Sequence, residues 1–180
     1  FDEQEGNLLT TEICAASNGR LLPLAAVNML GYDTGSNRIK EIAEGPFCGV
    51  SLFPKLQEWT WSDYIVESFA RDCSDNGLPI QACVWDRQGL AEVTRHLAPT
   101  GGKILLRWMA GSGYTFVPDI IAAGREHPNL VFDISTITQS GGIEILVERL
   151  GAERLYIASS MPLIAEGAPY FLLEAANLHD

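Results

Sequence analysis

The chain is short of the features that define several large classes of protein. Its longest apolar stretches break at Pro, Gly or a charged residue, so none approaches the roughly 18 residues of a membrane helix. Basic residues are also few, since 12 Lys and Arg stand against 23 Asp and Glu for a formal net charge of -11. Binding to a phosphate backbone depends on clustered Lys and Arg. We therefore expect neither nucleic acid nor a membrane as a partner.

Common motifs are missing as well. No GxGxxG follows any apolar run, and GSG at 111–113 is predicted to be a loop, which argues against dinucleotide binding. No signal peptide follows Phe1, and because Phe1 is not Met the natural N-terminus is expected to lie upstream. The cysteines form no CxxC pair, which favours reduced thiols and a cytoplasmic location. They are Cys14, Cys48, Cys73 and Cys83.

What remains is a repeated pattern of strand and helix. Short runs rich in Val, Ile and Leu alternate with amphipathic segments, as in parallel strands covered by helices. The runs begin at Leu21, Phe47, Leu78, Lys103, Leu130 and Arg154. The repeat is close to that of a (β/α)₈ barrel, whose full form needs about 250 residues. The sequence thus predicts one α/β domain over 1–180, a TIM-type (β/α) barrel with six visible βα units that is incomplete or a fragment.

The expected helices are recognised by apolar residues that recur at three and four positions. They cover residues 6–20, 36–45, 61–77, 89–99, 117–129, 142–153 and 166–178. Aromatic residues are concentrated in 53–64, which is predicted either to form a lid or interface patch or to pack onto the next helix with Ser62 as its N-cap.

Five strings resemble the amidohydrolase-2 branch of the amidohydrolase superfamily, in that family's order. They are NGRLLPLAAVN, GVSLFP, NGLPIQAC, NLVFDIS and LGAERLYIASSMPL, of which the last is similar to the family's "lGaeRilfGSDxPl". The family comprises metal-dependent TIM-barrel hydrolases and decarboxylases. The resemblance covers its last six strands and implies the same barrel fold here.

The chain departs from the family where the resemblance would place metal ligands, at the C-terminal ends of strands. Cys83 and Trp108 stand where the family has ligand histidines, and Ser160 stands where it has a catalytic Asp. Ser51 and Phe53 replace the Lys and His of "K-l-h-P". Trp cannot bind a metal and Ser is a poor base, so the resemblance implies a degenerate site.

The three histidines do not replace these ligands. His96 falls inside an expected helix, His127 precedes Pro128 at the other end of the barrel, and His179 is in the C-terminal tail. We therefore expect no metal and no other cofactor. Zinc remains the alternative, held by Cys83 together with the family's His-x-His, which the resemblance would place upstream.

Other polar residues near strand ends are candidates for ligand binding. Arg107 beside Trp108 offers a cation and a flat apolar face to a carboxylate or an aromatic ring, although strand neighbours point opposite ways. Asp86 lies on the same face, and the alternative for it is a solvated turn. Asp133 and Ser135 match the family's "D-x-S" and are predicted to have a structural hydrogen-bonding role, because polar groups inside a barrel need partners.

The sequence therefore favours a pseudoenzyme, which binds a small molecule at the strand ends or serves as a subunit of a homo- or hetero-oligomer. Its predicted binding residues are Ser51, Phe53, Cys83, Asp86, Arg107, Trp108 and Ser160. One alternative is an active metal-dependent hydrolase or decarboxylase with an unusual ligand set. Another is a structural protein whose free strand edges pair across a dimer.

Overall fold

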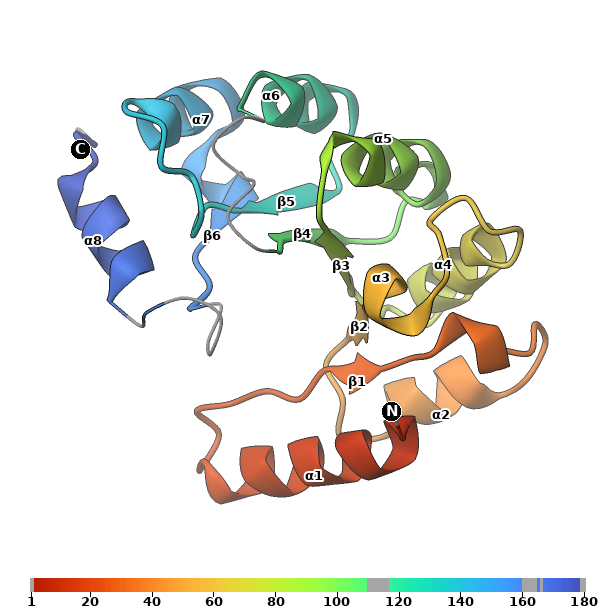
Figure 1. Ribbon diagram of the computed structural model, residues 1–180. Helices are drawn as coiled ribbons and strands as arrows, with labels where there is room; N and C mark the ends of the chain where they lie inside the picture. The colour runs from red at the N-terminus through yellow and green to blue at the C-terminus, as the bar shows by residue number, and fades with distance from the viewer. Residues whose placement is uncertain (1, 110–116, 160–164, 166, 179–180) are drawn as a thin grey trace.

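A single parallel sheet forms the centre of the protein in the computed structural model, which describes residues 2–109, 117–159, 165 and 167–178. Its order follows the chain, β1 to β6 (Figure 1). The strands are β1 (Ala25–Ala26), β2 (Val50–Leu52), β3 (Ile80–Val84), β4 (Ile104–Trp108), β5 (Leu130–Asp133) and β6 (Leu155–Tyr156). All five strand pairs are parallel. Each of the six predicted runs therefore contains a strand.

The helices in the described ranges are α1 (Glu3–Ala16), α2 (Arg38–Glu44), α3 (Pro54–Gln57), α4 (Val66–Asp75), α5 (Arg87–His96), α6 (Val117–Glu126), α7 (Gly142–Leu150) and α8 (Ala168–Ala175). Helices α2 and α4 to α7 cover the outer side of this curved sheet, while α1 lies beside β1 at one end of it and α8 lies beyond β6 at the other (Figure 1). Short 3-10 turns add η1 (Met29–Gly31), η2 (Ala98–Thr100) and η4 (Ala152–Arg154). Strand and helix alternate in sequence order, so the fold is the predicted incomplete TIM-type barrel.

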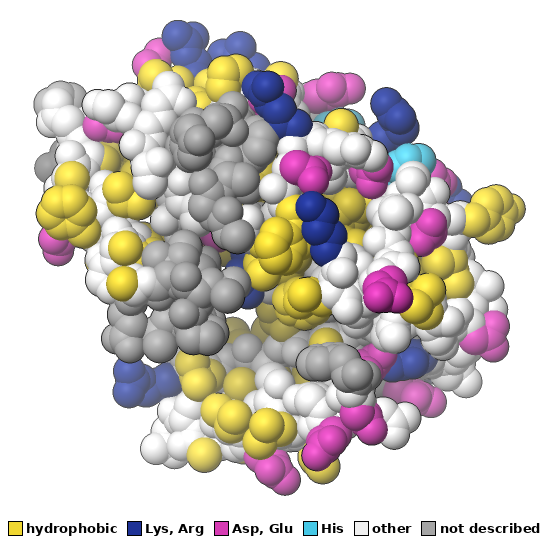
Figure 2. Space-filling model, viewed as in Figure 1, with side chains coloured by type: hydrophobic (Ala, Val, Ile, Leu, Met, Phe, Trp, Pro, Cys, Tyr) yellow, Lys and Arg dark blue, Asp and Glu magenta, His cyan; other side chains and the backbone are white. Residues whose placement is uncertain are grey.

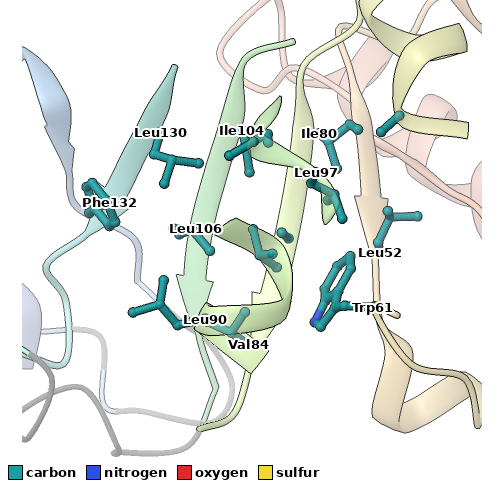
Figure 3. Close-up of a cluster of buried hydrophobic side chains, with 14 of the residues drawn as sticks. Leu52, Trp61, Ile80, Val84, Leu90, Leu97, Ile104, Leu106, Leu130 and Phe132 are labelled. Atoms are coloured by element: carbon teal, nitrogen blue, oxygen red, sulfur yellow. The ribbon is translucent and has the colours of Figure 1, made fainter. Parts of the chain in front are cut away.

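The hydrophobic core lies between the sheet and the helices. Every second residue of β4 is buried there, with Ile104 and Leu106 fully enclosed and Trp108 only 1% exposed. Figure 3 shows Leu90 of α5 and Leu97 beyond it against this side of the strands. Burying a side chain of this size stabilises the fold by about 1.5–3 kcal/mol. This alternation fixes which strand residues face the helices and which face the inside of the barrel.

The helices form where the apolar spacing predicts them. In α4, the buried residues Val66, Phe69, Ala70 and Cys73 follow the i, i+3, i+4, i+7 spacing of a single helix face. The predicted start at Ser62 is wrong, because α4 begins at Val66. A separate turn precedes it, in which the Asp63 carboxylate accepts hydrogen bonds from the Thr60 amide (2.9 Å) and hydroxyl (3.0 Å).

The aromatic segment 53–64 contributes mainly to the core. Trp59 and Trp61 are 5% and 3% exposed and pack edge to face with ring centroids 5.0 Å apart. Tyr64, in contrast, is fully exposed. The two tryptophans therefore belong to the hydrophobic core, whereas Tyr64 presents its ring to solvent.

No helix within the described ranges is long and apolar enough to cross a membrane.

Candidate functional site

The register of the sheet brings four polar side chains into one row on the inner face. Cys83 pairs with Arg107, and Asp133 pairs with Tyr156. Leu106 pairs with Phe132, so Arg107 and Asp133 are also neighbours across β4 and β5. In each strand, the residues next to these four in sequence face the helices. Because strand side chains alternate between the two faces of a sheet, the four side chains themselves point into the barrel. We call Cys83, Arg107, Asp133 and Tyr156 the inner row.

Ser51 and Gln81 lie one layer below the inner row. They pair across β2 and β3, two residues before the level of Cys83. The Ser51 hydroxyl donates to Gln81 Oε1 at 2.8 Å, and Ser51 is only 5% exposed. This hydrogen bond satisfies the Ser51 hydroxyl and the Gln81 carbonyl oxygen, and the pair forms a polar floor beneath the row.

Asp133 is the most deeply buried acid in the row, with none of its surface exposed. Its Oδ1 accepts hydrogen bonds from the Ser135 amide (2.8 Å) and the Ser135 hydroxyl, whose oxygen in turn accepts from the Ala158 amide at 2.6 Å. Oδ2 is buried and has no hydrogen-bond partner among the described residues. Burial raises the pKa of Asp133, while the Ser135 hydrogen bonds and the Arg107 charge oppose that shift.

Arg107 supplies the positive charge of the inner row. Its side chain is half-buried, and Nε is buried with no hydrogen-bond partner among the described residues. The guanidinium acts electrostatically on Cys83, Asp133 and Tyr156. The row thus holds a donor on Arg107 and an acceptor on Asp133 that the described part of the chain leaves unused, and a buried polar atom needs such a partner.

The other two members of the row are neutral at physiological pH. Burial raises the pKa of the Cys83 thiol to about 11, although Arg107 and Ser51 both lower it. Burial also raises the pKa of Tyr156, and the Asp133 charge adds to that shift. The Tyr156 hydroxyl donates to the Leu106 carbonyl at 3.1 Å. A neutral thiol is a weak nucleophile and a poor metal ligand, so Cys83 contributes a small, largely apolar side chain to the row.

The structure places the predicted site residues in four different settings, one of which is the rim position of Asp86. Ser51, Cys83 and Arg107 meet on the inner face, and Phe53 follows β2 directly and is half-buried. Trp108 is 1% exposed, and its place in the strand turns it toward the helices and away from the inner face. Ser160 lies outside the described residues.

Asp86 has a structural role at the rim. It is the N-cap of α5, where Oδ1 accepts from the Gly89 amide at 2.8 Å, and its Oδ2 pairs with Lys55 Nζ at 3.1 Å. These contacts lower the pKa of Asp86, with the Gly89 bond as the main cause. The Lys55 ammonium also lies 5.4 Å from the centre of the Trp85 ring. The pair joins the segments that follow β2 and β3.

The sequence reasoning missed Gln81 and Tyr156 and assigned Asp133 and Ser135 only to structure. The hydrogen bonds between Asp133 and Ser135 confirm the structural part of that prediction. The period-2 alternation was the available signal: once Arg107 faces inward, the residues level with it in the neighbouring strands must do so too.

The described residues do not fit a zinc ion. Among them, no three His, Cys, Asp or Glu side chains stand close enough to hold a metal. The inner row offers one carboxylate and one neutral thiol, and the Arg107 guanidinium beside them would repel a divalent cation. His96 bonds to Glu67 through Nδ1 at 3.0 Å, and His179 lies outside the described ranges.

The architecture is that of (β/α)-barrel decarboxylases among solved structures. A 2,6-dihydroxybenzoate decarboxylase complexed with 2,6-dihydroxybenzoate aligns with a TM-score of 0.67 at 10% identity, over 99% of this chain and 71% of its own. The 2,6-dihydroxybenzoate decarboxylase from Rhizobium gives 0.66 at 10%, over 99% and 72%. The 5-carboxyvanillate decarboxylase LigW from Sphingomonas paucimobilis gives 0.68 at 13%, over 99% and 70%. These likenesses show a shared fold.

Comparisons by sequence found no match: neither a protein-family model nor a curated protein matches the chain.

Proposed function

We propose that this protein binds a small anionic molecule at the inner row without metal-dependent hydrolysis, as a divergent pseudoenzyme on an amidohydrolase-2 scaffold. One observation carries the proposal. Arg107 Nε and Asp133 Oδ2 are both buried and lack hydrogen-bond partners among the described residues, on neighbouring strands of the inner face. A ligand that accepts from Arg107 and donates to Asp133 would satisfy both atoms once the side chains that cover them move to admit it, because neither atom is exposed in this structure.

The chemistry of these two groups defines the ligand. A guanidinium binds carboxylates by charge-assisted hydrogen bonds, and a buried carboxylate accepts from a hydroxyl. The ligand should therefore carry a carboxylate beside a hydroxyl. The name 2,6-dihydroxybenzoate describes such a molecule, and it belongs to two of the proteins that share this fold. The half-buried Phe53 and the neutral Cys83 supply apolar surface for a ring.

The same groups argue against hydrolysis. A metal-dependent hydrolytic site needs a metal-bound water, and the inner row contains a neutral thiol, a neutral phenol and a single carboxylate whose Oδ1 is already bonded to Ser135. The sequence departures at Cys83 and Ser160 agree with this reading, since each replaces a residue that the family resemblance would make functional.

Calorimetric titration of the purified chain with 2,6-dihydroxybenzoate in excess chelator tests the proposal. Removing a charge-assisted hydrogen bond costs about 1.5–3 kcal/mol, so Arg107→Gln should weaken binding about ten- to hundredfold. Arg71→Gln is the matched control, because Arg71 is an exposed arginine on α4 that pairs with Glu67. Equal affinity in the wild type and Arg107→Gln, or no binding by the wild type, would refute the assignment.

The competing function is an active metal-dependent decarboxylase. The likeness to three decarboxylase structures favours it, with ligands drawn from residues beyond the described ranges. Incubation of the protein with 2,6-dihydroxybenzoate and Zn²⁺ or Mn²⁺ separates the two functions. Release of carbon dioxide that a chelator abolishes would establish the decarboxylase and overturn the pseudoenzyme. Binding without turnover under every metal condition supports the pseudoenzyme.

A further inference from the structure

Strand β1 has backbone groups on its outer side that do not bond to another strand of the described sheet. The Ala25 amide donates to the Gly49 carbonyl at 2.9 Å, and the Val27 amide donates to the Ser51 carbonyl at 3.4 Å. These two residues bond to β2, so the amides of the alternate residues, Ala26 and Asn28, point away from the sheet. Strand β1 ends the sheet in the described part of the chain. Such outward backbone groups form a template on which another strand can add.

Helix α1 occupies that template with two side chains. Asn7 Oδ1 accepts from the Ala26 amide at 2.8 Å, while Asn7 Nδ2 donates to the Ala26 carbonyl at 2.9 Å. Glu3 Oε2 accepts from the Asn28 amide at 2.7 Å. The side-chain amide of Asn7 therefore forms the two hydrogen bonds that the N–H and C=O of one residue in a neighbouring antiparallel strand would form.

The spacing of these contacts has a geometric basis. Glu3 and Asn7 are four residues apart, which is roughly 6 Å along a helix and places them on one face. Ala26 and Asn28 are two residues apart, which is roughly 6.6 Å along a strand. Glu3 meets Asn28 and Asn7 meets Ala26, so α1 runs antiparallel to β1. The spacing of Glu3 and Asn7 on one face of the helix thus matches the spacing of the outward amides along β1.

Polar contacts, more than burial, hold α1 in place. None of its residues is buried, and its large apolar side chains Leu8, Leu9 and Ile13 are each more than half exposed. Arg38 of α2 forms an ion pair with Glu3, whose side chain is only 11% exposed. The helix therefore presents its polar side to the sheet, the reverse of an ordinary surface helix.

From this geometry we propose that α1 is an edge cap, which uses Asn7 and Glu3 in place of a strand and prevents β1 from pairing with β1 of a second copy. The contacts involve none of the inner-row residues, so the edge cap is independent of the proposed ligand site. Charged side chains or bulges on the edge strands of other sheets prevent edge-to-edge pairing in the same way. Loss of the cap would leave a sheet edge open to self-association.

Amide exchange followed by NMR tests the cap in the full chain. In Asn7→Ala, the Ala26 amide should exchange at least about tenfold faster than in the wild type, the factor that corresponds to about 1.4 kcal/mol. The Ala25 amide, which bonds to β2, should change much less. Gln4→Ala is the control, because Gln4 is exposed on the same helix. Light scattering at rising concentration should show a larger mean mass for Asn7→Ala than for either reference.

Two results would overturn the edge cap. One is unchanged Ala26 exchange in a folded Asn7→Ala protein, and the other is faster exchange with a mean mass equal to that of the wild type at every concentration. If Asn7→Ala does not fold, Asn7→Asp is decisive. It keeps the acceptor for the Ala26 amide and removes the donor to the Ala26 carbonyl, so protection of the amide must survive. Loss of that protection in Asn7→Asp contradicts the proposed contacts.

Discussion

Replacing Asp133 by Asn probes the electrostatics of the inner row most sharply. Asn keeps an oxygen that can accept both Ser135 hydrogen bonds, and it removes the charge from a side chain with no exposed surface. Burial raises the pKa of Asp133, so the folded state holds its proton to higher pH than the unfolded state does. Wild-type stability from this group is complete below the ordinary carboxyl pKa and is lost as pH rises through the folded-state pKa.

The sign and size of the effect follow from linkage. The free energy of unfolding of Asp133→Asn, minus that of the wild type, should increase with pH above about 4, by at most about 1.4 kcal/mol per pH unit. At about pH 4, Asp133→Ala should lower the free energy of unfolding by about 2–4 kcal/mol, since it loses two hydrogen bonds and leaves buried donors unpaired. Urea denaturation across pH measures both. A pH-independent difference, or one that falls with rising pH, would refute the burial argument.

Other expectations concern the core, the thiols and one close packing site. Leu106→Ala should lower the free energy of unfolding by about 2–5 kcal/mol in urea, whereas Leu56→Ala, at a side chain 65% exposed, should change it by less than about 0.5 kcal/mol. Under native conditions a thiol reagent should label the exposed Cys48 quickly and the buried Cys83 only after unfolding; rapid labelling of Cys83 would contradict its burial and raised pKa. Gly49→Ala should destabilise the start of β2, because its Cβ would stand 2.7 Å from the Pro79 carbonyl oxygen, and a variant as stable as the wild type in thermal melts would contradict that contact.

Much of the fold could be predicted from sequence because its signals are local. Apolar runs bounded by Gly or Pro mark the six strands, and the 3.6-residue spacing marks helices such as α4. Capping was harder. Ser62 has the chemistry of an N-cap, but Asp63 competes by binding Thr60, and the helix starts later.

The site was only partly accessible to sequence reasoning, because it depends on register between strands far apart in the chain. Alignment to family motifs pointed to Trp108, whereas strand alternation assigns the inner face to Arg107. The unpaired Oδ2 of Asp133 has no sequence signal at all, since it arises from which neighbours reach a buried carboxylate. The contact of Asn7 with Ala26 is equally long-range, between a helix and a strand edge.

The central claim is that Arg107 holds an anionic ligand without a metal. The most direct test is the ¹⁵N NMR signal of Arg107 Nε, assigned by its loss in Arg107→Gln, during titration with 2,6-dihydroxybenzoate in excess chelator. The account predicts a saturable shift of that signal, because the unpaired Nε gains a charge-assisted hydrogen bond. A signal that stays unmoved in chelator, and shifts only after Zn²⁺ is added, would contradict it.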